Sequence, residues 1–258
     1  MSRMSVGFLS LLLGGLLSTT TASASSGQES GLLSRNAKVG TTSYVYQVYV
    51  PAKLQGQKNL PVILFLHGIG QRGAGGFLPT EGVQAGMLRH YLEQIPAIVV
   101  LPQCRQGSYW TDPEMDEMVM KSLAQTVSEF GADPERLYLT GVSMGGFGAW
   151  HLASEYPERF AAIVAICGGS PLRSGDRFAP IARKVGQTPA WLFHGSDDRV
   201  VPVSESRQIV AALKAIKGNV RYNEYEGVGH NVWLKALAEQ ELIPWLLKQH
   251  RQEKHQGD

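Results

Sequence analysis

Unbroken apolar segments recur along the chain, and longer stretches with helical spacing of apolar residues separate them. An apolar run of about four to eight residues is typical of a strand buried on both faces of a parallel sheet. The segment at residues 44–50 alternates weakly between aromatic, β-branched and polar residues, which favours an outer strand. The strands predicted on these grounds span residues 44–50, 61–66, 97–101, 137–140, 161–166, 190–193 and 220–225.

Helical patterns fill the stretches between these strands. The helix predicted over residues 112–130 has Thr111 as its N-cap and Pro113 near its first turn, and Gly131 ends it. Strands that alternate with helices predict a parallel α/β sheet. Neither an internal repeat nor a linker divides the chain, so we predict a single domain over residues 41–250 with a polar tail at 251–258. The other predicted helices span residues 145–155, 203–217 and 232–249.

The first 24 residues have the layout of a cleaved secretory signal peptide. Arg3 precedes an apolar run over residues 6–17, and the segment ends in small residues up to Ala24. A membrane-spanning helix needs roughly 20 apolar residues, so an uncleaved anchor is the weaker alternative. We expect cleavage after Ala24, a secreted or periplasmic protein without stable membrane insertion, and a flexible leader over residues 25–40.

Charge gives no indication of a nucleic-acid or anionic-membrane partner. The chain has 24 basic and 22 acidic residues, a net charge of +2, and removal of the signal peptide takes away only Arg3. A surface this close to neutral has no electrostatic reason to bind polyanions. Export would permit a disulfide between the only two cysteines, Cys104 and Cys167, but two buried thiols at the ends of strands are the simpler interpretation.

The sharpest local signal is the sequence GVSMGG at residues 141–146. It follows a predicted strand and precedes a predicted helix, which is the context that a nucleophile elbow requires. The turn is so tight that the central residue takes strained backbone angles, and the flanking glycines give the backbone room. Ser143 is thereby placed at the carboxyl edge of the sheet, where the N–H of Met144 can donate to a developing oxyanion. We predict Ser143 as a nucleophile.

A serine hydroxyl is a weak nucleophile until a base accepts its proton. Among seven histidines, His230 is the best candidate, because it follows the last predicted strand and its loop reaches the same sheet edge as Ser143. The others lie in helical stretches, in the polar tail, or before a glycine at a strand end, where structural roles are expected: His67, His90, His151, His194, His250 and His255.

The imidazole in turn needs a carboxylate that fixes its tautomer. Two adjacent candidates, Asp197 and Asp198, follow the strand at residues 190–193, and side-chain direction lets only one of them face His230. The order serine, aspartate, histidine along the chain is that of α/β-hydrolases. A second oxyanion donor is expected after an early central strand, where Gly68 allows close backbone approach and Ile69 supplies the N–H.

These motifs resemble the α/β-hydrolase superfamily. Within it, the chain is similar to the branch of small carboxylesterases and "predicted peptidases" that includes polyhydroxyalkanoate-depolymerase-like proteins, and more loosely to feruloyl esterases, acetylxylan esterases and dienelactone hydrolases. In that branch the motif HGxxDxxVP carries the acid of the triad, which implies Asp198 rather than Asp197. The motifs that carry the resemblance lie at residues 67–68, 133–136, 141–146, 194–202 and 229–230.

The resemblance implies a mostly parallel sheet of about eight strands with helices on both faces. It also implies hydrolysis of an ester through an acyl-enzyme, without a metal or an organic cofactor. Dienelactone hydrolases carry cysteine at the elbow, and Ser143 argues against that activity. A peptidase or amidase, or an acyltransferase, would share the triad, and a non-catalytic binding module on this fold is a more distant alternative.

Only residues 168–184 occupy the region where many relatives insert a helical cap. We therefore expect a minimal cap and an open site for short-acyl, aromatic or polymer-linked esters. Trp110 and Trp233 follow strands at the catalytic edge, where they would stack on a substrate ring or simply pack. Arg72 and Arg105 are either contacts for an anionic group or solvated surface residues. The oligomeric state is left open by the sequence.

Overall fold

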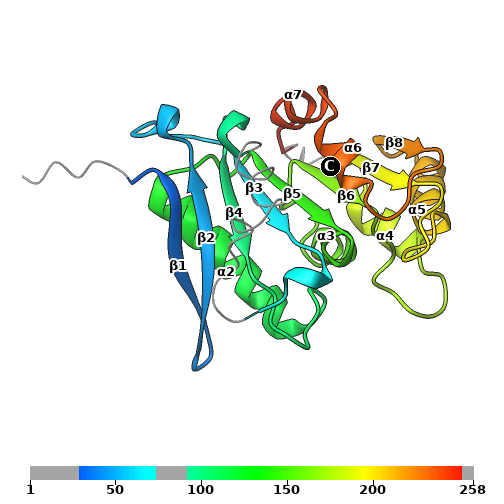
Figure 1. The fold of residues 1–258 in the computed structure, drawn as a ribbon, viewed down its shortest axis with the longest axis horizontal. Coiled ribbons are helices and arrows are strands. Elements are labelled where there is room, and N and C mark those ends of the chain that lie inside the picture. The colour runs from blue at the N-terminus through cyan, green and yellow to red at the C-terminus, as the bar shows by residue number, and fades with distance from the viewer. Residues whose placement is uncertain (1–28, 74–91, 252–258) are drawn as a thin grey trace, which may run out of the picture.

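A sheet of eight strands forms the centre of the molecule (Figure 1). The computed structural model describes residues 29–73 and 92–251. The strand order is β1-β2-β4-β3-β5-β6-β7-β8, in which β2 is antiparallel to both of its neighbours and the pairs from β4 to β8 are all parallel. The strands are β1 (Gly31–Val39), β2 (Thr42–Val50), β3 (Val62–Leu66), β4 (Ile98–Pro102), β5 (Leu137–Val142), β6 (Ala162–Ile166), β7 (Ala190–Gly195) and β8 (Val220–Tyr225).

Successive residues of the central strands enter two different apolar cores. Leu64 and Leu139 are buried in the core on one face, whereas Ile63 and Tyr138 are buried in the core on the other. Side chains alternate between the faces of a strand, so a strand covered on both faces must be apolar throughout. This explains the unbroken apolar runs and confirms the predicted parallel α/β sheet.

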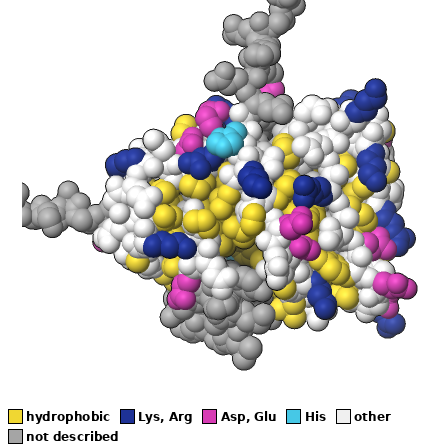
Figure 2. Space-filling view, turned by 90° about the horizontal axis from the view of Figure 1, so that it is seen from above, with side chains coloured by type: hydrophobic (Ala, Val, Ile, Leu, Met, Phe, Trp, Pro, Cys, Tyr) yellow, Lys and Arg dark blue, Asp and Glu magenta, His cyan; other side chains and the backbone are white. Residues whose placement is uncertain are grey.

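Helices cover both faces of the sheet. The first core is completed by α2 (Pro113–Phe130), α3 (Met144–Glu155), α4 (Ala179–Val185) and α5 (Ser204–Ala215). The second core is completed by α6 (Trp233–Leu237) and α7 (Leu242–Leu247), which lie on the upper side in Figure 1. Seen from that side, hydrophobic side chains gather in the middle of the surface, and charged side chains lie mostly around them (Figure 2).

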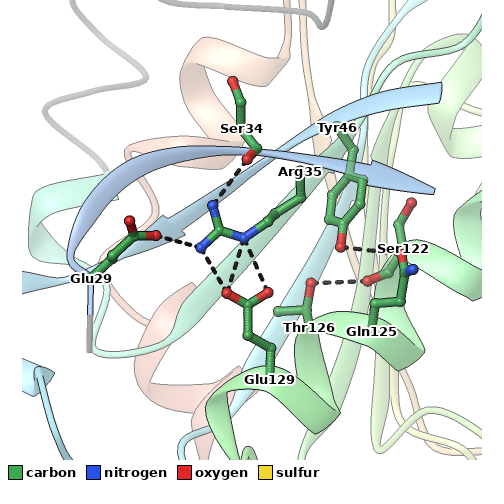
Figure 3. A network of polar contacts seen from close by, with 8 residues as sticks. All are labelled: Glu29, Ser34, Arg35, Tyr46, Ser122, Gln125, Thr126 and Glu129. Carbon is green, nitrogen blue, oxygen red and sulfur yellow. Dashed lines mark hydrogen bonds and ion pairs between the residues drawn. The ribbon is translucent and has the colours of Figure 1, made fainter. Parts of the chain in front are cut away.

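The prediction of a flexible leader over residues 25–40 is wrong for residues 31–39, which form the edge strand β1. Ala37 and Val39 are buried against the core, while the polar residues between the apolar ones face outward. Arg35 connects the strand to α2, because its guanidinium pairs with Glu129 and also with Glu29 (Figure 3). A half-exposed edge strand has the composition of a loop, which is why the segment lacked a strand signal.

The helix expected over residues 232–249 is divided into α6 and α7. Pro244 lacks an N–H, and inside a continuous helix its ring would clash with the carbonyl of Gln240, so the second helix begins close to the proline instead. Trp245 of α7 packs edge-to-face on Trp191, with ring centroids 5.2 Å apart, and Arg221 lies over both rings. Aromatic packing thus holds α7 on the sheet.

The cysteines do not form a bridge. Cys104 and Cys167 are both free and buried, as the simpler interpretation held. Within residues 29–73 and 92–251, no helix is long and apolar enough to cross a membrane. The predicted signal peptide, the tail residues 252–258 and His90 lie outside the described residues.

Candidate active site

Ser143 occupies a strained turn between β5 and α3. Its backbone angles, φ 54° and ψ −118°, are rare for a residue with a side chain. A Cβ at Gly141 would lie 2.0 Å from the carbonyl oxygen of Gly145, and a Cβ at Gly145 would lie 2.0 Å from that of Leu66. Both positions therefore exclude any larger residue. Packing on either side of the turn holds the serine at the carboxyl edge of the sheet.

Three side chains from separate loops meet at this edge in one line of hydrogen bonds. The hydroxyl Oγ of Ser143 lies 2.8 Å from Nε2 of His230, and Nδ1 of His230 lies 2.6 Å from Oδ2 of Asp198. A carboxylate only accepts, so Nδ1 carries the hydrogen and Nε2 is free to accept the serine proton. The structure thus brings together the three residues that were singled out in the sequence.

Asp198 is held in a single orientation by donors on both oxygens. Its side chain has no exposed surface, and Oδ1 accepts hydrogen bonds from the N–H groups of Val200 and Val201 at 2.8 and 2.9 Å. Burial alone would raise the pKa of this carboxyl group. The hydrogen bonds from His230 and from the two N–H groups outweigh that effect and lower its pKa from the ordinary value of an aspartate. Asp198 is therefore ionised at neutral pH.

The loop that follows β7 and the loop that follows β8 are joined by their backbones. The N–H of Asp197 donates to the carbonyl of Val228 at 3.0 Å, and the N–H of Ser196 donates to that of Tyr225 at 3.0 Å. A Cβ at Gly195 would lie 2.1 Å from the Val228 oxygen, so only glycine permits this approach. These contacts bring the loop with Asp198 against the loop with His230.

The loop after β3 lies directly beside Ser143. A Cβ at Gly68 would lie 3.6 Å from Cβ of Ser143, and Ile69 begins a short 3-10 helix over Ile69–Gln71. Met144 is the first residue of α3, where backbone N–H groups have no partner within the helix. The expected oxyanion donors, Ile69 and Met144, thus belong to segments that flank Ser143.

His67 and Trp110 hold this loop in place. The N–H of Cys104 donates to Nε2 of His67 at 3.1 Å, so Nδ1 carries the hydrogen and donates to the carbonyl of Gly68 at 2.7 Å. Burial lowers the pKa of His67 to about 4, and the ring is neutral at neutral pH. The indole N–H of Trp110 donates to the carbonyl of His67 at 2.9 Å.

The expected substrate contact at Trp110 is wrong. The indole is only 1% exposed and packs under the loop after β3, so packing is its role in this structure. Trp233 is half-buried and meets His230 edge-on, with ring centroids 5.9 Å apart, which places it beside the site. Arg105 lies over the ring of Tyr44, and Arg72 donates to the carbonyl of Ser108.

Sequence analysis missed a set of exposed apolar side chains in the segments that follow five strands of the sheet, here called the apolar rim. The five segments follow the carboxyl ends of β3, β4, β6, β7 and β8, and each contributes one of these side chains. The carboxyl ends of parallel strands meet at one edge of the sheet. Residues 168–178 contribute only a loop before α4 to this edge, in agreement with the minimal cap expected. Among the described residues, the large hydrophobic side chains that are exposed are Ile69, Tyr109, Leu172, Val200 and Leu234.

One cluster near the serine has the composition of a metal site. In the described part of the chain, ligand atoms of Cys167, Asp198 and His230 lie within 4.8 Å of one another. Burial raises the pKa of the Cys167 thiol to about 12, so the sulfur keeps its proton at neutral pH. Asp198 and His230 are already bonded to each other, and a metal at this place would break their hydrogen bond.

Comparison with known proteins places this geometry in context. The sequence profile of a family described as phospholipase/carboxylesterase matches residues 106–242, which include Ser143, Asp198 and His230. Acyl-protein thioesterase 1 of Gibberella zeae is 24% identical over 70% of this chain and 88% of its own length. Carboxylesterase SOBER1 of Arabidopsis thaliana is 27% identical over 68% of this chain and 85% of its own length.

Solved structures share the architecture. A thermostable esterase superposes with a TM-score of 0.71 at 33% identity, over 85% of this chain, which spans 63% of that protein. The feruloyl esterase module from Clostridium thermocellum superposes with a TM-score of 0.68 at 14% identity, over 90% of this chain and 92% of the module. The second likeness concerns the fold alone.

Proposed function

Because the chain belongs to the phospholipase/carboxylesterase family, with the α/β-hydrolase fold, and is a hydrolase of the carboxylesterase and thioesterase type, we propose that Ser143, His230 and Asp198 form its catalytic triad. The observation that carries the proposal is the line of hydrogen bonds from the serine hydroxyl to the buried carboxylate. The reaction proposed is the cleavage of a carboxylic ester through an acyl-enzyme.

In the first step, His230 accepts the proton of Ser143 as Oγ attacks the ester carbonyl. The negative charge that develops on the carbonyl oxygen is stabilised by the N–H groups of Ile69 and Met144. Asp198 stabilises the imidazolium without taking its proton. His230 then protonates the departing alcohol, and the acyl group remains bonded to the serine.

In the second step, His230 removes a proton from water, and the hydroxide attacks the acyl carbonyl. Collapse of this intermediate releases the acid and returns the proton to Ser143. The side chains named here supply every proton transfer, so the proposed mechanism needs no metal or organic cofactor.

The apolar rim supports esters with an apolar acyl or alcohol group, such as short-acyl, aromatic or polymer-linked esters. Exposed hydrophobic side chains at a site entrance bind apolar surface that would otherwise remain in water. Because a relative bears the name acyl-protein thioesterase, thioesters belong in the same screen. Peptidase and acyltransferase activities remain alternatives on the same triad, and matched ester, thioester and amide substrates separate them.

The test is the Ser143→Ala variant with a short p-nitrophenyl ester. We expect turnover to fall by a factor of roughly 10⁴ or more, while the melting temperature stays close to that of the wild type. A fluorophosphonate probe should label the wild type and leave the variant unlabelled. Activity close to that of the wild type in Ser143→Ala would refute the assignment.

We further propose that the protein acts outside the cytoplasm. The support is the basic, apolar and small-residue pattern of residues 1–24. Expression of the full chain in a bacterium that exports proteins tests this, since N-terminal sequencing of the exported product should begin at Ser25. Recovery of the intact chain from the cytoplasm alone would contradict it.

A further inference from the structure

His194 lies beside Asp198, in the strand that leads into its loop. It is the fifth residue of β7, and its side chain has no exposed surface. Its Nε2 lies 3.0 Å from the carbonyl oxygen of Val201 and 3.3 Å from Oδ2 of Asp198. Its Nδ1 lies 2.7 Å from Oγ of Ser206, at the start of α5. The ring therefore bonds both to the loop that carries Asp198 and to the helix that follows this loop.

The neighbours of the ring fix its tautomer. Both groups that face Nε2 only accept hydrogen bonds, so Nε2 carries the hydrogen. Burial lowers the pKa of His194, which keeps the ring neutral and leaves Nδ1 to accept the hydrogen of the Ser206 hydroxyl. The ring is thus a fixed donor that connects α5, through β7, to the carboxylate.

The carboxylate has four close polar contacts, and Nε2 of His194 makes one of them at 3.3 Å. Oδ1 accepts from two N–H groups of its own loop, whereas Oδ2 lies 2.6 Å from Nδ1 of His230 and 3.3 Å from Nε2 of His194. The same Nε2 also binds the carbonyl of Val201, whose N–H donates to Oδ1. Removal of the donor would therefore release the Val201 carbonyl of the loop and, with it, the 3.3 Å contact to Oδ2.

From this geometry we propose that His194, supported by Ser206, is a positioning residue that holds Oδ2 of Asp198 toward His230. The proposal rests on the triad proposed above. His194 does not touch the substrate or the reacting atoms. Its contribution acts through Asp198, and it concerns the rate of the chemical step rather than substrate binding.

Two substitutions at His194 distinguish the effect of its hydrogen-bond donor from the effect of its side-chain volume. Glutamine can place its amide nitrogen where Nε2 lies, whereas phenylalanine fills the space without a donor. Relative to the wild type, we expect kcat of His194→Phe to fall by between about tenfold and hundredfold, with KM within about twofold. We expect His194→Gln to recover most of that loss, and His194→Asn, whose nitrogen falls near Nδ1, to recover little.

The pH profile gives a readout that a purely structural role would not move. If Asp198 no longer faces His230, protonated His230 loses its counter-ion, and the acidic limb of kcat/KM moves to lower pH in His194→Phe. All rates are taken per site labelled by a fluorophosphonate at completion, so that misfolded protein does not count. His151→Phe is the matched control, since His151 pairs with Asp116 away from the triad. It should lower the melting temperature without moving the acidic limb.

An unchanged kcat and acidic limb in His194→Phe would overturn the proposal, as would equal recovery by Asn and Gln. If His194→Phe does not fold, Ser206→Ala decides, because it removes one hydroxyl group. A loss of about threefold to tenfold in kcat would support the proposal, and wild-type kcat would overturn it. Ser143→Ala is measured in parallel. Its activity tests the triad itself, so failure of the triad is distinguishable from failure of His194.

Discussion

The carbonyl oxygen of Leu66 lies against Gly145 so closely that a Cβ on Gly145 would be 2.0 Å from it. This contact joins the end of β3, which leads into the loop of Gly68, to the first turn of α3, which follows Ser143. The turn of Ser143 and the loop of Gly68 are therefore positioned by one packing contact between two backbones.

Gly145→Ala should consequently impair both stability and activity. The added methyl group must push β3 and α3 apart, and we expect a loss of at least about 2 kcal/mol in the free energy of unfolding. Urea denaturation measures this. Gly70→Ala is the control, since a Cβ at Gly70 meets nothing within 4 Å and should change stability by no more than about 0.5 kcal/mol.

His67 makes stability depend on pH. Its pKa is about 4 in the folded protein, well below its ordinary value of 6.5, so the unfolded chain binds a proton between these values and the native state does not. Stability must therefore rise with pH from about 4 to 6.5, and by linkage this one group contributes about 3 kcal/mol.

The measurement is the free energy of unfolding at pH values between 4 and 7.5. Wild-type protein should lose stability as the pH falls through this window, and His67→Asn should show a shallower dependence. His194, whose pKa is also lowered, adds a slope of the same sign, so some dependence remains in the variant. Identical slopes in the two proteins would contradict the assignment.

Trp110 should act on stability rather than on substrate choice. Trp110→Phe loses the hydrogen bond to the His67 carbonyl and leaves a void, and we expect destabilisation of about 1–3 kcal/mol. KM values for aryl and alkyl esters should change in parallel. A selective rise of KM for aryl esters would restore Trp110 as a contact for the substrate ring.

The apolar rim should determine the preference for chain length. Val200→Ser and Leu234→Ser remove apolar surface at side chains that are 69% and 40% exposed. We expect kcat/KM for octanoate esters to fall by about twofold to tenfold in each variant, and acetate esters to be affected little. Equal effects on both esters would show that these side chains do not contact the acyl group. Melting temperatures close to that of the wild type serve as the control.

The meeting of Ser143, Asp198 and His230 could be predicted because its signals are local. The glycine spacing around Ser143 follows from the tight turn, and the order of Ser143, Asp198 and His230 along the chain follows from the order of the strands. Strands buried on both faces were equally visible, since they must be apolar at every position. The distance along the sequence between these elements did not affect their prediction, because each element is identified by its own local pattern.

Predictions failed where the direction of a side chain in space determines its contacts. Trp110 does follow a strand at the catalytic edge, but a turn between Tyr109 and Asp112 directs its indole inward to His67. His194 was assigned a turn role, and its contact with Asp198 exists only because the loop folds back over the ring. β1 escaped notice because an edge strand with one exposed face contains as many polar residues as a loop.

The hydrogen bond between Ser143 and His230 joins residues 87 positions apart, and β6 and β7 lie between β5 and β8 in the sheet. A contact of such long range depends on the pairing of the intervening strands, and non-local pairing of this kind forms slowly. In a chain that has misplaced any of these strands, His230 does not reach Ser143 and the proposed triad is not formed. Recovery of hydrolytic activity during refolding should therefore measure complete assembly of this half of the sheet. We expect misassembled chains to have no such activity.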